Sequence, residues 1–465
     1  MSSLGRIGWG VLFLSISLCA GAGAQDNPQA PTPVPAFGQA NTPILNPENP
    51  PLSGLDEPSL ELKTASRSFI SPALQVGESA DSNPSNSLNG SRAEAVSHVL
   101  GAFDLQKFWP RSDLFLEYLG GAAFGDSPYY VRQVEAVGLE GVTRWRTGRL
   151  TLRDSASYLP DGSLFAATAG GFPGFGIAMG AGMGVGLPGI YHLAVTSVGT
   201  IPRFSNTGIL DMVQAITPRS AFTLVGAFSN ARFYHNTDDL ANGDETTVEG
   251  GYSHLVSRHD QVAAVFAFQL FRFPVNTGGE IYNYVFNVRW SHTINGRMSF
   301  IGEVGPQYTD LQFGISSPNL SVAGRAALRY RFQHTSLTAS YEKYTAEGGG
   351  FFAGSERQVA EVTLRRPLGR TYEVSAEAGY AHNHRLQAAV IPGAGVGGAK
   401  VYNEGYAGAI LRKHLGRAFD AIAGYRFAEV AFDVPVTLGG TKGKINQRQI
   451  GTIALEWHPK PTRIE

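Results

Sequence analysis

Residues 281–293, IYNYVFNVRWSHT, alternate strictly between two kinds of side chain. One parity holds the apolar members Tyr282, Tyr284, Phe286, Val288 and Trp290. The other parity holds the polar members Asn283, Asn287, Arg289 and Ser291. Successive side chains of a β-strand point to opposite faces, so this pattern predicts a strand with one apolar and one polar face. What lies against each face decides the fold class.

The same alternation recurs to the end of the chain, as in LSVAGRAALRYRF (320–332) and AFDAIAGYRFAE (418–429). Short turns such as 217–220 alternate along the chain with longer polar or Gly-rich connections such as 159–206 and 431–446. Short turns at one end and long loops at the other are typical of an outer-membrane barrel. We therefore predict an all-β fold, a transmembrane up-and-down antiparallel β-barrel of about eighteen strands. Sixteen strands remain an alternative, as do twenty if residues 188–200 form a further hairpin.

The composition excludes several other classes of protein. Charged residues make up 16% of the 465 residues, against about 25% in soluble domains. The net charge of -1 argues against a nucleic-acid binder, which needs a basic face. A mean hydropathy of -0.08 argues against a helical membrane protein.

The N-terminus predicts export. Residues 1–24 combine Arg6, an apolar run and the A-x-A site that ends at Ala24, which are the parts of a signal peptide. A membrane anchor is the alternative, but the apolar run is short for a spanning helix. The only cysteine, Cys19, lies in this segment, so the mature chain is expected to lack thiol chemistry.

The rest of the chain is predicted to have three parts. Residues 25–64 are rich in Pro, Asn and Gln, which predicts a disordered periplasmic linker. The barrel is expected over residues 65–458, followed by a C-terminal tail at 459–465. The barrel places the protein in the outer membrane, with both termini on the periplasmic side.

Charged side chains share the polar parity, because an Arg facing lipid at mid-depth would cost about 2–4 kcal/mol. We expect them to face a water-filled lumen. The candidate lumen-lining residues are Arg289, Glu303, Arg325, Arg329, Glu342, Glu373, Glu377 and Arg426. They either set ion or solute selectivity, as charged rings do in channels, or pair with one another across neighbouring strands.

Aromatic residues gather near the predicted short turns. The candidate girdle consists of Trp145, Trp290, Tyr330, Tyr372, Phe419 and Trp457. Amphipathic rings favour the headgroup level of a bilayer, which explains such a girdle. The alternative is a soluble β-fold, but its core aromatics would be spread along the strands.

Five stretches resemble predicted outer-membrane β-barrel proteins found in acidobacterial genomes. They are PPLSGLDEPSLE (50–61), SASYLPDGSLF (155–165), EVGPQY (303–308), EGGGFFAGSE (347–356) and AGYAHN (378–383). The resemblance implies a porin-like architecture and an outer-membrane location, and it names no substrate. The last strand is similar to the signal read by the barrel-assembly machinery, with Gly451, Leu455 and Trp457, although KPTRIE follows Trp457.

The Gly-rich stretch GGFPGFGIAMGAGMGVGLPG (170–189) is apolar and uncharged. Its many glycines and two prolines disfavour a transmembrane helix. We predict that the loop 159–206 folds into or across the barrel mouth and narrows the pore. An exposed loop is the alternative.

The function that these features favour is a porin-like passive diffusion channel for small hydrophilic solutes. A structural, anchoring or polymer-exporting barrel is the alternative. An outer-membrane hydrolase built on His382 and His384 with Ser375 or Asp420 lacks the defined spacing that such catalysis needs. We therefore predict no catalytic, cofactor or metal site. The expected partners are the outer-membrane bilayer, the barrel-assembly machinery and small solutes, with no nucleic acid and a homotrimer left open.

Overall fold

The computed structural model describes most of the chain from residue 68 onward. The described residues are 68–83, 88, 93–125, 131–159, 203–233, 240–273, 279–312, 316–332, 335–346, 351–386, 398–416, 418–438, 441–457, 459 and 462–464. The predicted signal peptide, the predicted linker and the Gly-rich stretch 170–189 lie outside them.

The described residues form nineteen β-strands. These are β1 (Phe69–Asp81), β2 (Glu94–Phe108), β3 (Ser112–Gly125), β4 (Val131–Trp145), β5 (Gly148–Leu159), β6 (Arg203–Thr217), β7 (Ser220–Phe233), β8 (Gly243–Leu255), β9 (Asp260–Arg272), β10 (Glu280–Asn295), β11 (Met298–Gln312), β12 (Ser316–Phe332), β13 (Thr335–Ala346), β14 (Ser355–Leu368), β15 (Tyr372–Arg385), β16 (Val401–His414), β17 (Phe419–Leu438), β18 (Thr441–Trp457) and β19 (Thr462–Arg463).

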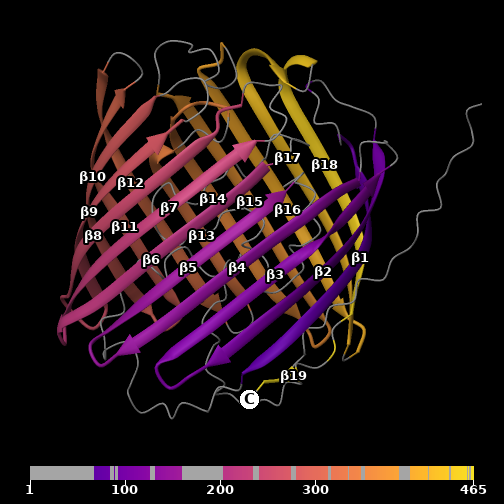
Figure 1. Cartoon of the computed structure of the whole chain (residues 1–465), viewed down its shortest axis with the longest axis horizontal. Coiled ribbons are helices and arrows are strands. Elements are labelled where there is room, and N and C mark those ends of the chain that lie inside the picture. The colour runs from indigo at the N-terminus through magenta and orange to yellow at the C-terminus, as the bar shows by residue number, and fades with distance from the viewer. Residues whose placement is uncertain are drawn as a thin grey trace, which may run out of the picture.

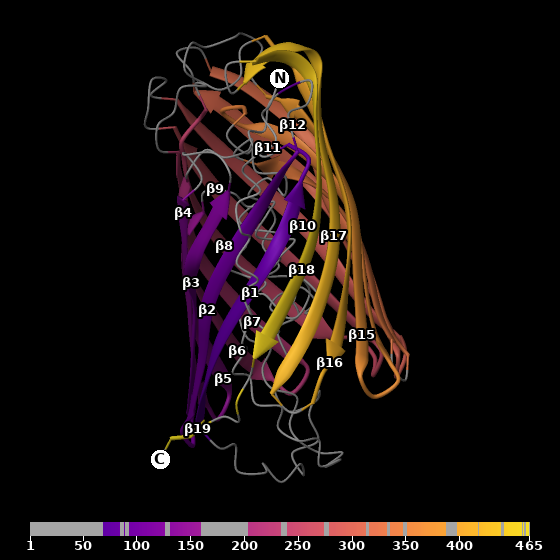
Figure 2. The same cartoon turned by 90° about the vertical axis from the view of Figure 1, so that its right-hand side faces the viewer.

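The strands form one closed antiparallel barrel (Figure 1). Each of β1 to β18 pairs with its neighbours in sequence, and β1 also pairs with β18, from Leu74 opposite Trp457 to Asp81 opposite Ile450. Figure 2 shows β1 lying between β2 and β18. The prediction of a transmembrane up-and-down antiparallel barrel is confirmed.

The strand count differs slightly from the prediction of about eighteen. The added strand is the two-residue β19, which pairs with the start of β1 from within the predicted tail. The alternative of sixteen strands is wrong. Since β5 pairs directly with β6, no hairpin is inserted into the sheet between these two strands.

Connections sort by length between the two ends of the barrel. At one end, turns such as 146–147, 218–219 and 296–297 join an even-numbered strand to the next strand. At the other end lie the longer connections, and 160–202 separates β5 from β6. One predicted loop is wrong, because β17 and β18 continue through most of residues 431–446. The Gly and polar residues there resemble a loop in sequence, yet they pair as a hairpin that extends both strands.

The alternation that opened the sequence analysis is realised on β10. Phe286 is 50% exposed, whereas its neighbour Asn287 is 4% exposed. The outward-facing residues Val304, Val322 and Ile453 on other strands are exposed in the same way. An exposed apolar wall on a closed barrel is suited to contact with hydrocarbon.

The inner wall is more closely packed than the expectation of a water-filled lumen implied. Asn283 is buried because its amide donates to Gln269 Oε1 at 2.6 Å and its Oδ1 accepts from Thr309 at 2.9 Å. Long polar side chains on adjacent strands thus satisfy one another. Some inward positions of β2 and β3 are instead apolar, as the buried Leu100 and Leu119 show.

Two absences concern only the described part of the chain. It contains no helix that is long and apolar enough to cross a membrane. It also contains no group of three or more His, Cys, Asp or Glu side chains that could hold a metal ion.

The exposed wall predicts a depth-dependent penalty for charge. Phe286→Arg in the middle of β10 should lower the free energy of unfolding by about 2–4 kcal/mol, because the guanidinium would meet hydrocarbon. Ile294→Arg, on the same face beside the turn, should cost about 0–1 kcal/mol. Urea unfolding from lipid vesicles measures both, and equal losses would contradict a bilayer around this wall.

Candidate functional site: the inner wall and the mouth

A row of four alternating charges crosses the inner wall. Arg289 on β10 is paired in register with Glu303 on β11, Glu303 with Arg325 on β12, and Arg325 with Glu342 on β13. Directly opposite side chains on neighbouring strands lie about 5 Å apart. The register therefore brings each cation beside an anion, and we call these four residues the charge ladder.

Distances within the charge ladder show that its members are ion-paired. Arg289 Nε donates to Glu303 Oε2 at 2.8 Å, and Arg325 Nε lies 3.2 Å from Glu342 Oε1. Asn287 also donates to Glu303, at 2.6 Å. All four ladder residues are between 4% and 7% exposed. At this burial an unpaired charge would be costly, so the alternation of sign is what permits charge here.

The other predicted lumen-lining residues are spread more widely. Arg426 on β17 reaches across to Glu377 on β15, whereas Glu373 pairs with Arg365 nearer the short turns. Arg329 lies on β12 four residues from Arg325 toward the short turns, opposite Ser299 and Thr338. The structure thus gathers four of the eight candidates into the ladder, pairs Arg426 with Glu377, and leaves Arg329 and Glu373 in separate positions. Their role in selectivity stays a prediction.

Several buried ion pairs were not singled out from the sequence. Arg357 on β14 pairs with Glu404 on β16 at 2.9 Å, and both side chains are almost fully buried. Arg448 on β18 pairs with Asp81 on β1, across the line where the barrel closes. The signal in the sequence was their polar parity, but parity does not tell which distant strand supplies the partner.

A compact aromatic segment, Phe351–Gly354, lies at the end of the barrel that carries the longer connections. Phe351 stacks edge-on against Tyr402 of β16 and Phe432 of β17, with ring centroids 4.9 and 5.1 Å apart. Phe352 contacts Tyr402 in the same way at 5.0 Å. All of these rings are buried.

The same segment also contacts a different part of the wall. Ala353 packs in a buried apolar cluster with Phe271 of β9, Ile281 of β10 and Leu311 of β11. Gly354 has a φ of +92°, and a Cβ there would lie 2.2 Å from Ile281 Cδ1. Only glycine combines this backbone conformation with so close an approach.

Phe351–Gly354 therefore joins β16 and β17 to β9, β10 and β11 inside the mouth. Leu88 and Leu240, from the β1–β2 and β7–β8 connections, pack into the same cluster as the two Phe side chains. The prediction that the loop 159–206 narrows the pore falls on residues 160–202, outside the described residues. The stretch EGGGFFAGSE held the local signal, since two adjacent Phe residues between glycines are unusual in a polar loop.

The predicted girdle residues lie at the short-turn end of their strands. Trp290 donates its indole N–H to Asp260 Oδ1 at 3.1 Å, and Trp145 donates to Gln214 Oε1 at 2.9 Å. Phe419 and Trp457 are directly opposite each other on β17 and β18. Tyr330 stacks with Phe332, and Tyr372 lies beneath the Lys413 ammonium. Rings with an apolar body and a bonded polar edge suit the headgroup level.

The residues considered for hydrolysis do not form a triad. His382 bonds to Asn403 Oδ1 at 2.7 Å, and Asp420 bonds to His414 and Arg412. His384 and Ser375 lie nine residues apart along β15 and face opposite sides of the sheet by parity.

Comparisons with known proteins find matches among solved structures only. No family model and no curated protein sequence matches the chain. Solved structures similar to it include OccAB3 of Acinetobacter baumannii (12% identity, 83% of this chain, 98% of that chain, TM-score 0.39). Another is OpdQ of Pseudomonas aeruginosa (9% identity, 84% of this chain, 98% of that chain, TM-score 0.40). A third is the FrpB iron transporter from Neisseria meningitidis (7% identity, 83% of this chain, 81% of that chain, TM-score 0.38).

The charge ladder predicts a strong dependence on pairing. Glu303→Gln should lower the free energy of unfolding by about 3–5 kcal/mol, because buried Arg289 would lose its carboxylate partner at 2.8 Å and be left with the more distant Glu249 carboxylate at 3.7 Å. The matched change Glu373→Gln, in a pair whose Arg365 side chain is 33% exposed, should cost about 0–1 kcal/mol. Urea unfolding in vesicles compares the two, and a small loss for Glu303→Gln would count against the ladder.

Proposed function

We propose that the protein is an outer-membrane channel through which small hydrophilic solutes diffuse passively. The observation that carries the proposal is the charge ladder on the inner wall of a closed barrel whose outer wall is apolar. Strands alternate apolar-out and polar-in in barrels that enclose a polar interior. The outer-membrane location rests on the same alternation, since closed barrels with short turns at one end belong to that membrane.

The charges favour a channel over a purely structural barrel. Replacing a buried ion pair by well-packed apolar residues is often neutral or stabilising. A barrel that only anchors the envelope therefore gains nothing from Arg289, Glu303, Arg325 and Glu342. A wall beside which polar solutes pass gains fixed dipoles and charges that substitute for their hydration.

The second candidate is a barrel without a permanently open pore. It is favoured by the burial of the charge ladder and by the contacts of Phe351–Gly354 with both sides of the mouth. The proposed channel accommodates the same facts if this segment restricts passage to small solutes.

Other parts of the proposal rest on the sequence alone. They are the signal peptide at 1–24, the periplasmic linker at 25–64, and recognition of β18 by the barrel-assembly machinery. The proposed relation to the acidobacterial barrel proteins and the proposed trimeric assembly also rest on the sequence alone.

Conductance tests the proposal directly. The refolded mature protein in a planar lipid bilayer should give steady ohmic steps, because a diffusion pore needs no energy source. Heat-denatured protein serves as the control. Complete absence of steps from a correctly folded barrel would move the function to the second candidate.

The mouth segment predicts a change in pore size. Phe351→Ala with Phe352→Ala should increase the single-channel conductance, since two buried rings that span the contacts between β16, β17 and the neighbouring connections are removed. Phe228→Ala, on the exposed outer wall, is the control and should leave conductance unchanged. Equal conductance in all three proteins would show that Phe351–Gly354 does not restrict the pore.

A further inference from the structure

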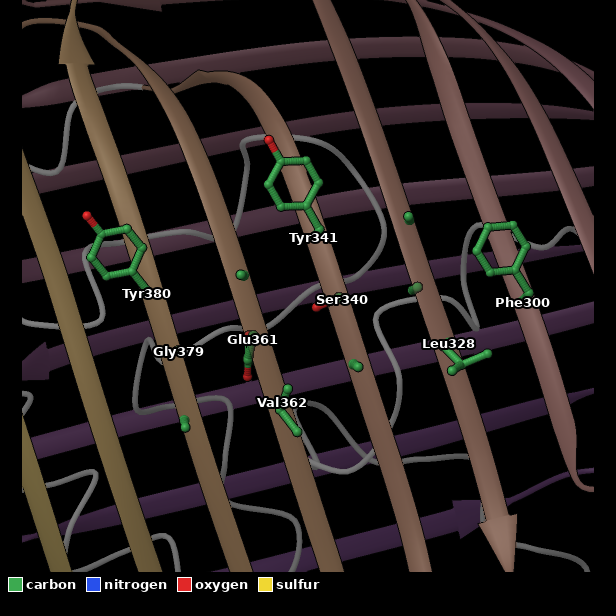
Figure 3. Close-up of a pocket in the computed structure, with 13 residues that line it drawn as sticks. Phe300, Leu328, Ser340, Tyr341, Glu361, Val362, Gly379 and Tyr380 are labelled. Atoms are coloured by element: carbon green, nitrogen blue, oxygen red, sulfur yellow. The ribbon is translucent and has the colours of Figure 1, made fainter.

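A shallow groove of about 520 Å³ lies on the outer wall across β11 to β15. Its floor consists of small side chains, Ala326, Ala339, Ala360 and Ala378, together with Gly379. Larger side chains stand around it, and Figure 3 shows Tyr341, Tyr380, Phe300, Leu328 and Val362 in these positions. The hollow exists because the outward-facing alanines are shorter than the side chains around them.

The register explains the width of the groove. Ala360 of β14 lies directly between Tyr341 of β13 and Tyr380 of β15. Neighbouring strands are about 4.8 Å apart, so the two tyrosines start about 10 Å from each other. A chain of methylene groups needs about 4 Å to the atoms on each side. The gap over Ala360 therefore has the width of one hydrocarbon chain.

A row of polar residues lies directly beyond the groove, toward the end with the longer connections. Lys343, Gln358, His382 and Asn403 are paired in register across β13 to β16, two residues from Tyr341, Ala360, Tyr380 and Gly405 respectively. We call these four residues the polar row. Tyr341 donates its hydroxyl to Gln358 Oε1 at 3.2 Å, which joins the groove to this row.

The two features together have the form of a lipid molecule. The wall is apolar at the groove and becomes polar within one step of the register, as a bilayer does between its acyl chains and its headgroups. Figure 3 shows the hydroxyls of Tyr341 and Tyr380 pointing toward the end at which the Tyr380 strand terminates, the side of the polar row.

We propose that this groove binds one acyl chain of a phosphate-bearing membrane lipid, with its headgroup against the polar row. Lys343 supplies the cation, because its ammonium has three donors and the ion pair with Glu356 at 3.0 Å occupies one of them. Gln358 and His382 offer further polar atoms to the headgroup. The site lies outside the barrel, so it stands whether or not the channel conducts.

A second copy of the chain fits the groove less well. Association of two barrels here would bury the polar row and the Lys343–Glu356 pair, which are partly exposed, and burying such charges is costly. A concave surface also cannot pair with itself about a two-fold axis without a matching protrusion.

Native mass spectrometry of the delipidated full-length mature protein tests the proposal with phosphatidylglycerol as the probe. The wild type should retain one lipid. Ala360→Phe should weaken binding about tenfold, as expected when about two methylene groups lose their place in the groove. Ala409→Phe, at an exposed outer position of β16 outside the groove, should bind like the wild type.

Two further variants separate the headgroup from the chain and guard against misfolding. Lys343→Gln should weaken phosphatidylglycerol binding and leave binding of diacylglycerol, which lacks the phosphate, unchanged. Ala360→Val should give a smaller loss in the same direction if Ala360→Phe fails to fold. Wild-type binding by the folded Ala360 variants would overturn the proposal. So would dimers that Ala360→Phe dissociates, since the groove would then hold a second copy.

Discussion

The pairing of every backbone N–H and C=O group is the constraint on which this molecule depends. A strand edge exposed to hydrocarbon would leave a row of such groups without partners, at several kcal/mol each. The contact of β1 with β18 removes both edges at once. Side chains add further bonds along this closing line, an ion pair between Asp81 and Arg448 and a hydrogen bond between Ser79 and Thr452. The contact between β1 and β18 is therefore held by more than its backbone hydrogen bonds.

Once the sheet is closed, the two faces of each strand are set against different surroundings. Outward positions take apolar residues because hydrocarbon offers no partner for a charge. Inward positions carry charges in the ladder because the register supplies the opposite sign at each step, as between Arg289, Glu303, Arg325 and Glu342. Ion pairs of this kind depend on alignment, since moving one strand by a single residue would turn that strand's member of the charge ladder toward lipid and leave its partners unpaired.

The sequence predicted what depends on local periodicity, and missed what depends on long-range approach. Alternation at 281–293, turn residues and sorted connections led to the closed barrel and its strands. Residues 431–446 were wrongly predicted to be a loop, because the same Gly and polar residue types occur in loops and in hairpins that extend two strands beyond the rim. Other features can be predicted only once the positions of the neighbouring strands are known. These are the partners of Arg357 and Arg448, the alanine groove and the inward course of Phe351–Gly354. Parity gives a direction for each side chain, but no distance.

One feature of the mouth has a mechanical consequence. Phe351–Gly354 is fastened on one side to Tyr402 and Phe432, and on the other to Ile281 through Ala353 and Gly354. It acts as a cross-tie between strands that are several places apart in the sheet. The rim at this end is thereby stiffened against changes in its outline, because the segment links strands that do not pair with one another in the sheet.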